Sequence, residues 1–101
     1  MAAEYTREDR DIAATVGSEL VIAVASNPTT GYTWHAHVDS AALALIDHAF
    51  AALGTGVGAG GVERFRFKVL AAGDSVIRLV RKRAWEAISV EDLTFRVHAS
   101  G

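Results

Sequence analysis

Few side chains in this sequence have the types and spacing that chemistry requires, and histidines come closest. His35 and His37 are two residues apart, so they would share one face of a strand, as in a two-histidine metal clamp. Two imidazoles without a third ligand nearby make a weak site, and a solvent-exposed strand face is the better interpretation. His48 and His98 have no motif around them. We therefore expect no metal site and no cofactor.

Catalysis is not indicated by the remaining side chains. Ser26, Thr29 and Thr30 carry hydroxyl groups, but no histidine can be assigned to any of them as a general base. The sequence contains no cysteine, which excludes a thiol nucleophile, a thiolate metal site and a disulfide framework. We expect that the protein is not an enzyme.

The glycine-rich stretch 54–61 contains a formal match to the dinucleotide-binding pattern G-x-G-x-x-G, at residues 56–61. That pattern binds nucleotides when it lies between a strand and a helix. Here the glycines lead into residues 62–69, whose alternating pattern predicts a strand, so we reject nucleotide binding. Two interpretations remain open: a flexible hairpin connection, or a loop whose bare backbone can lie close against another protein.

Residues 27–32, Asn-Pro-Thr-Thr-Gly-Tyr, form the most informative segment. They separate two apolar strand patterns, at residues 20–25 and 32–38. Pro28 fixes its own φ angle and favours an extended conformation at the residue before it, while Gly31 can adopt a positive φ angle. Two threonines are thus held at the tip between stiff flanks. Such a loop is better suited to contact with a partner than to simple chain reversal.

Trp85 follows a predicted strand at residues 75–82. If Leu79 faces the core, Arg81 and Arg83 share its parity, and two bases would not enter a core. We therefore expect the strand to have left the sandwich by this point and Trp85 to lie at an end or in a loop. An exposed tryptophan beside arginine has the composition of an interface hot spot. The alternative is that Trp85 folds back and caps the core.

The segments that must position these residues alternate between apolar and polar side chains, as half-buried strands do. Trp34 has the parity of the core face. Residues 40–50 are ambiguous because alanine and leucine also favour a helix; we favour a turn at 40–42 followed by a strand. Strands are predicted at residues 11–16 (an edge strand), 18–25, 32–38, 43–50, 62–69, 75–82 and 93–97. About seven short strands separated by turns predict an all-β sandwich.

Length and composition limit the organisation and the partners of the chain. Its 101 residues suffice for one hydrophobic core, so we expect a single domain over residues 1–101. The net charge of −2 gives no reason to expect nucleic acid or a membrane as partner. The sequence has no apolar run of membrane-spanning length. Its charged N-terminal segment is unlike a secretory signal, so we expect a cytoplasmic protein or an exported one whose signal was removed.

Three segments in order, at residues 27–32, 58–61 and 83–85, resemble the chagasin-like inhibitors of papain-family cysteine peptidases. The marks of that family are an N-P-T-T-G-[YF] loop, a G-x-G-G loop and an R-P-W loop on an immunoglobulin-like β-sandwich. The resemblance spans nearly the whole chain, including Trp34 just after the first loop. One motif alone would be weak, but three in order at compatible spacing are specific. The resemblance implies an immunoglobulin-like sandwich of about seven to eight strands.

The resemblance also implies a function and a set of site residues. The protein would be a monomeric, reversible, tight-binding inhibitor of a papain-like or cathepsin L-like cysteine peptidase. Three loops at one end of the sandwich would block the active-site cleft, the first entering it and the others gripping it from either side. The implied peptidase-binding residues are Asn27, Pro28, Thr29, Thr30, Gly31, Tyr32, Gly58, Ala59, Gly60, Gly61, Arg83, Ala84 and Trp85.

The sequence departs from the family pattern at Ala84, where the family usually has proline. Without that ring the third loop is expected to be less rigid, so its ordering on binding weakens the affinity by up to about 1 kcal/mol. The alternative function is a non-inhibitory immunoglobulin-like binding or adhesion module, favoured if the three loops lie far apart. A third class, a small metal- or nucleotide-dependent enzyme, conflicts with the observations above.

Overall fold

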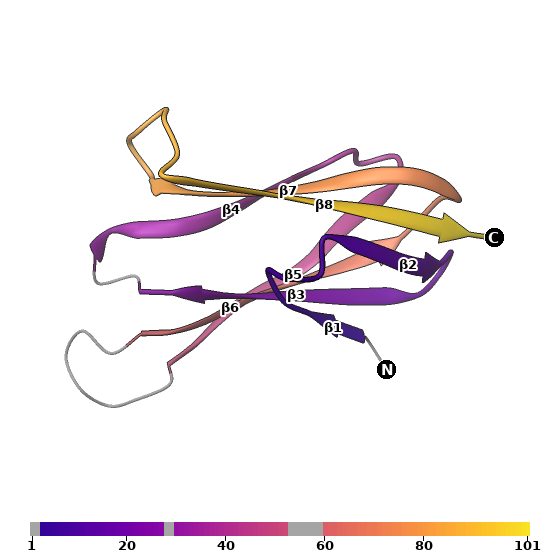
Figure 1. The fold of residues 1–101 in the computed structure, drawn as a ribbon, viewed down its shortest axis with the longest axis horizontal. Helices are drawn as coiled ribbons and strands as arrows, with labels where there is room; N and C mark the ends of the chain where they lie inside the picture. Colours follow the sequence, from indigo (N-terminus) through magenta and orange to yellow (C-terminus); the bar gives the residue numbers. More distant parts are fainter. Residues whose placement is uncertain (1–2, 28–29, 53–59) are drawn as a thin grey trace.

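The computed structural model describes residues 3–27, 30–52 and 60–101, which form two four-stranded sheets packed face to face (Figure 1). One sheet has the strand order β1-β3-β6-β5 and the other has the order β2-β8-β7-β4. The strands are β1 (Ala3–Tyr5), β2 (Asp11–Thr15), β3 (Glu19–Ser26), β4 (Tyr32–Val38), β5 (Leu43–Ala52), β6 (Gly61–Val69), β7 (Gly73–Arg83) and β8 (Glu91–Ser100). Within these residues, no helix has the length and apolar character needed to cross a membrane.

The predicted all-β sandwich is confirmed, and its strands follow from the periodicity of the sequence. β3 and β7 are central strands and β2 is an edge strand, as their patterns indicate. The ambiguous segment 40–50 forms a turn and then β5, and the turn is closed by Asp39, which accepts hydrogen bonds from the N–H groups of Ala41 and Ala42 at 3.0 Å each. β1 was not expected. It is a three-residue strand that pairs in parallel with β3 through main-chain hydrogen bonds, which leave no periodic signal in the sequence.

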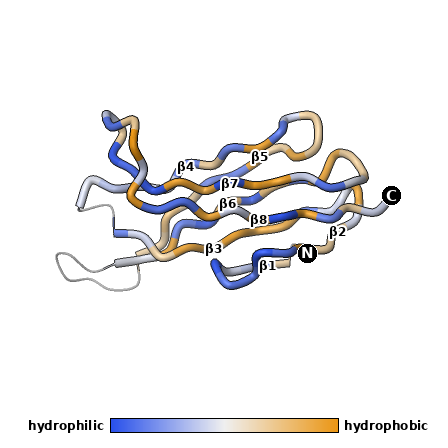
Figure 2. Tube along the Cα trace, turned by 45° about the horizontal axis from the view of Figure 1, so that its top comes forward, coloured by the Kyte–Doolittle hydropathy of each residue, from blue (hydrophilic) through white to orange (hydrophobic). Residues whose placement is uncertain are grey.

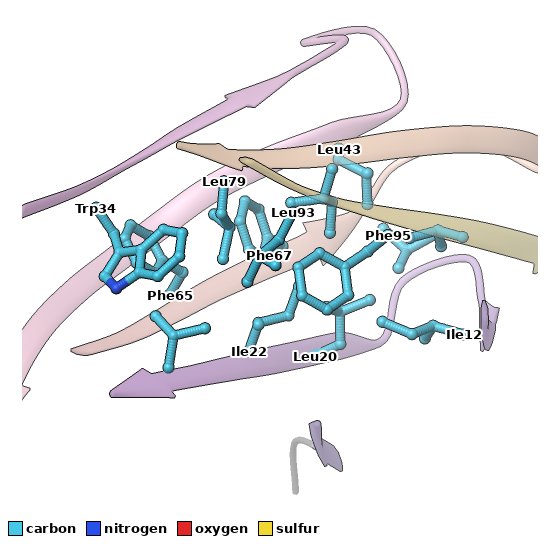
Figure 3. Packing of buried hydrophobic residues seen from close by; sticks show 14 residues of the cluster. Ile12, Leu20, Ile22, Trp34, Leu43, Phe65, Phe67, Leu79, Leu93 and Phe95 are labelled. Carbon is cyan, nitrogen blue, oxygen red and sulfur yellow. The ribbon is translucent and has the colours of Figure 1, made fainter. Parts of the chain in front are cut away.

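The core lies between the two sheets and contains large aromatic side chains from both (Figure 3). Along β6, Phe65 and Phe67 are buried while Arg64 points outward, so the period-two prediction is correct for this strand. Figure 2 shows the same contrast along the chain: β3 is hydrophobic over most of its length, whereas β8 alternates. Trp34, the tryptophan predicted to face the core, is only 2% exposed.

The expectation that β7 leaves the sandwich at Arg81 is wrong. β7 stays paired with β4 up to Arg83, which lies opposite Tyr32. The two arginines nevertheless avoid the core because they cover its end. The guanidinium of Arg81 lies 6.0 Å from the ring centroid of Trp34 and that of Arg83 lies 4.5 Å from the ring centroid of Tyr32. Stacking on aromatic rings lets a cation occupy a strand position on the same side as the core residues while its charge stays accessible to water.

Candidate functional site

Three connections leave the sandwich at the same end. They join β3 to β4, β5 to β6, and β7 to β8. In one sheet, the pairing of Gly61 with both Ser26 and Ala52 brings the stems of the first two connections together. In the other sheet, Tyr32 pairs with Arg83, which brings together the stems of the first and third. In Figure 1 these strand ends all lie at the left, opposite the C-terminus.

The first connection contains the predicted residues Asn27, Thr30, Gly31 and Tyr32; Pro28 and Thr29 lie outside the described residues. The main-chain N–H and the side-chain hydroxyl of Thr30 both donate to the carbonyl oxygen of Asn27, at 3.1 and 2.8 Å. Gly31 has a φ angle of 83°, so the predicted positive φ is confirmed. These features bend the chain sharply just before β4 begins.

The second connection is described from Gly60 onward, whereas Gly58 and Ala59 lie outside the described residues. A Cβ atom on Gly61 would lie 2.3 Å from the carbonyl oxygen of Ala51 and 2.5 Å from the ring of Phe50, so only glycine fits there. A Cβ atom on Gly60 would lie 3.4 Å from the carbonyl oxygen of Ser26. The start of β6 therefore lies directly against the stem of the first connection.

The third connection begins with a turn in which the N–H of Glu86 donates to the carbonyl oxygen of Arg83 at 3.1 Å. Ala84 and Trp85 are the two central residues of this turn. The N–H of Val90 donates to the carbonyl oxygen of Arg81 at 2.8 Å and closes the connection at its far side. Trp85 is 76% exposed, so its expected place in a loop is confirmed, and the alternative that it caps the core is wrong.

The first and third connections touch each other. A Cβ atom on Gly31 would lie 3.8 Å from side-chain atoms of both Arg83 and Trp85. The guanidinium of Arg83 lies over two rings, 4.5 Å from the centroid of Tyr32 and 5.9 Å from that of Trp85. Both distances are short enough for a cation–π attraction, which favours this position of the guanidinium. The alternative of widely separated loops is not favoured by these distances.

An ionic cluster fixes the far stem of the third connection. Glu91, the first residue of β8, accepts hydrogen bonds from Arg7 and from Arg81, the latter at 3.0 Å. Burial alone would raise the pKa of the Glu91 carboxyl, but hydrogen bonds and charge from the two arginines hold that pKa below its ordinary value. The stem is thus anchored to the N-terminal segment as well as to β7.

Sequence reasoning missed two residues of this end. Ile88 is 81% exposed and Val90 is 53% exposed. With Trp85 they are the exposed large apolar side chains of the third connection, which we call the apolar tip. In the sequence, residues 86–92 have acidic residues at both ends, which is typical of a polar connection between strands. The signal that could have identified the apolar tip is the presence of two aliphatic residues within an otherwise polar loop.

The histidines first considered as metal ligands do not gather into a site. The imidazole of His35 lies 3.3 Å from the hydroxyl of Thr33, and His37 is exposed on the same strand. Among the residues that the structure describes, no three acidic or histidine side chains are arranged to hold a metal ion. His48 does have a partner that sequence reasoning missed: its Nε2 atom lies 2.6 Å from Oε1 of the buried Glu63.

Solved structures similar to this one include a cysteine protease inhibitor and a protein solved in complex with falcipain-2. A cysteine protease inhibitor from Entamoeba histolytica, EhICP2, is 23% identical with a TM-score of 0.84, covering 98% of this chain and 96% of its own. Amebosin is 23% identical with a TM-score of 0.68, covering 99% of both chains. PbICP-C, solved in complex with falcipain-2, is 17% identical with a TM-score of 0.64, covering 99% of this chain and 90% of its own. At these identities the similarity shows a shared fold.

The family assignment comes from a sequence comparison. No curated protein matches the chain. The family model described as chagasin family peptidase inhibitor I42 matches residues 13–99, which is most of the sequence. The protein therefore belongs to the chagasin family of peptidase inhibitors and is an inhibitor rather than an enzyme.

Proposed function

We propose that this protein is a reversible, tight-binding inhibitor of a papain-family cysteine peptidase and blocks the active-site cleft with its three connections. In this proposal, residues 1–101 act as one monomeric inhibitor domain, and the partner is papain-like or cathepsin L-like. The solved complex of the similar protein PbICP-C with falcipain-2 supports a partner of this kind. The observation that carries the proposal is the proximity of Gly31 in the first connection to Arg83 and Trp85 in the third, at one end of the sandwich.

The geometry of the first connection explains how the cleft could be occupied without cleavage. A substrate must present an extended backbone so that its carbonyl carbon meets the catalytic thiolate in the correct direction. The positive φ angle of Gly31 and the hydrogen bonds from Thr30 to Asn27 hold the chain in a bent conformation instead. A bent loop entering the cleft would exclude substrate and deny the thiolate its attack geometry, so binding is non-covalent.

The third connection would supply most of the hydrophobic contact. Trp85 and Ile88 project into solvent, and large exposed apolar side chains beside arginine are typical of binding hot spots. The turn at Arg83 and the stacking of its guanidinium fix the connection before binding. A pre-organised loop loses little conformational entropy, so a contact of standard size, about 1,600 Å² in total, is compatible with nanomolar affinity.

An inhibition panel tests the proposed function. We expect the protein to inhibit papain and a cathepsin L-type enzyme at nanomolar concentration, to leave a serine peptidase such as trypsin active, and to release active enzyme on dilution. It should also bind a papain variant whose catalytic cysteine is replaced by alanine, because no covalent bond is required. No inhibition by micromolar folded protein would refute the proposal.

Trp85→Ala provides the sharpest variant for this panel. We expect the inhibition constant to rise by at least roughly 30-fold, the effect of removing a hot spot of about 2 kcal/mol. Val76→Ala is the matched control, because Val76 is an exposed apolar residue on a strand face away from the connections. Equal inhibition by both variants would show that the third connection does not contact the peptidase.

A further inference from the structure

Glu63 is a buried acidic residue that the proposed mechanism does not use. It lies two residues after Gly61 on β6 and is only 2% exposed, with the parity of the core residues Phe65 and Phe67. An apolar side chain would satisfy this position better, because a carboxylate removed from water is unfavourable unless hydrogen bonds replace its hydration. A glutamate on the same strand face as two core phenylalanines therefore indicates that its hydrogen bonds have a structural role.

The hydrogen bonds of Glu63 join both stems of the first connection to one atom. Its Oε2 atom accepts from the hydroxyl of Ser26 at 2.5 Å and from the main-chain N–H of Trp34 at 3.2 Å. Ser26 ends β3 in one sheet, and Trp34 follows the start of β4 in the other. The indole N–H of Trp34 also donates to the carbonyl oxygen of Ala25 at 2.9 Å. The spacing between the two stems is thus fixed by two interactions: the shared bonds to Glu63 and the direct bond from Trp34 to Ala25.

The other oxygen of Glu63 is held by β5. Its Oε1 atom lies 2.6 Å from Nε2 of His48, within hydrogen-bonding distance. The His48 ring is itself stacked on Phe65, with centroids 4.1 Å apart and planes 13° apart. The carboxylate therefore cannot rotate away from the two stems without breaking the contact with a ring that packing already fixes. Four strands, β3, β4, β5 and β6, meet at this one side chain.

We infer that Glu63 is a positioning residue, whose carboxylate sets the separation of the β3 and β4 stems and thereby holds the first connection in its inhibitory shape. This inference rests on the proposed function, but its structural part does not require a peptidase. Two sheets of a sandwich can shift relative to each other, and a connection that passes from one sheet to the other follows that shift. A single buried acceptor bonded to both stems prevents the movement at the point where the connection begins.

Two substitutions at this position separate positioning from folding. Glu63→Leu keeps the volume but leaves the Ser26 hydroxyl and the Trp34 N–H without an acceptor. Glu63→Gln keeps all three contacts, because the amide oxygen can accept from both stems and the amide N–H₂ can donate to His48 Nε2. Val97→Ala is the control for general destabilisation, since Val97 is fully buried in β8 toward the opposite end of the sandwich.

Each variant is measured in two ways: by the inhibition constant for papain at a temperature where it is fully folded, and by amide hydrogen exchange of residues 30–34 in the free protein. For Glu63→Leu we expect inhibition to weaken about tenfold, as for the loss of one or two hydrogen bonds, and exchange to accelerate locally. Glu63→Gln should restore both properties toward the wild type. Val97→Ala should lower the melting temperature without either local change.

Several outcomes decide the inference. Equal behaviour of Glu63→Leu and Val97→Ala, or no rescue by Glu63→Gln, would overturn the positioning role. If the wild type failed to inhibit papain while Glu63→Leu still accelerated exchange at residues 30–34, the proposed function would be wrong and the positioning role would stand. If Glu63→Leu did not fold, Ser26→Ala would remove one of the two stem bonds, and unchanged inhibition and exchange in that variant would contradict the inference.

Discussion

The two ends of the sandwich close the same strands in different ways. At the end opposite the three connections, short turns reverse the chain, with positive φ angles at Gly17 and Gly73. The charged side chains there satisfy one another, as His98 does with Asp74 at 2.8 Å. At the other end, Gly31 also has a positive φ angle, but the connections expose the apolar tip. Both ends therefore share turn geometry and carry exposed aliphatic side chains; the end with the connections differs in exposing a large aromatic ring, that of Trp85, which is 76% exposed.

The two tryptophans give the largest contrast to test. Trp34→Ala should lower the free energy of unfolding by about 3–5 kcal/mol, because it removes a fully packed ring with a bonded indole N–H. Trp85→Ala should change it by less than about 0.5 kcal/mol, because that ring lies in solvent. Urea unfolding followed by circular dichroism measures both. Similar losses in the two variants would mean that Trp85 is part of the core.

A bulky charge on the first connection should have the next largest effect. Thr30→Arg is expected to weaken papain inhibition by about 2 kcal/mol or more, roughly 30-fold, because the exposed threonine would lie in the cleft. Thr94→Arg places the same side chain on the exposed face of β8 and should leave inhibition within about twofold. Steady-state inhibition kinetics measure both, and a similar loss in the two variants would place the first connection outside the contact.

The apolar tip can be compared directly with an apolar turn at the other end. Ile88→Ser should weaken inhibition by about 1.5 kcal/mol, roughly tenfold, since its side chain would be buried only on binding. Leu70→Ser is the counterpart, because Leu70 is an exposed aliphatic residue after β6 at the opposite end. It should leave the inhibition constant unchanged. Surface plasmon resonance of both variants tests this, and no loss with Ile88→Ser would restrict the contact to Trp85.

Rigidity of the third connection should have a smaller effect. Ala84 is the second residue of the turn that begins at Arg83, a position that proline favours. Ala84→Pro is therefore expected to strengthen inhibition by up to about 1 kcal/mol, roughly fivefold, mainly through slower dissociation. Ala84→Gly should act in the opposite direction, because glycine increases the freedom of the unbound loop. Weaker binding by Ala84→Pro would show that the loop must rearrange on docking.

The smallest effect is expected at the end without the connections. Hydrogen bonds to Asp74 and then Asp11 raise the pKa of His98 above its ordinary value. The pairing therefore stabilises the fold below the ordinary histidine pKa, and this contribution is lost as pH rises through the higher folded-state value. An NMR titration should show the pKa of His98 falling in Asp74→Asn, with papain inhibition unaffected. An unchanged pKa would contradict the pairing.

Much of the fold could be predicted because period two is a local property of the sequence. It located every strand of the described residues except β1, and it predicted the burial of Trp34 and the boundaries of β4. The positive φ angle of Gly31 was also predictable from a local property, because glycine adopts such an angle in a turn at little steric cost. The apolar tip was missed, because whether an aliphatic residue in a loop is buried depends on parts of the chain distant in sequence.

The remaining errors concern side chains whose partners come from other strands. The strand was expected to have left the sandwich by Arg81, but rings on β4 provide a surface for this side chain at the end of the core. Glu63 alternates in step with the core residues of its strand. Its carboxylate oxygens nevertheless bond to Ser26, Trp34 and His48, which lie on three different strands. No local pattern identifies such a meeting point. It appears only when the register of both sheets is known.

The central claim is that one end of the sandwich, and not the other, contacts the peptidase. The most direct measurement is the change in amide NMR signals of the isotope-labelled inhibitor when it binds unlabelled papain. The account predicts strong changes at residues 27–32, 60–61 and 83–90, with the turns at residues 15–18 and 70–73 unaffected. Changes concentrated at those opposite turns or on a sheet face, with the three connections unperturbed, would contradict it.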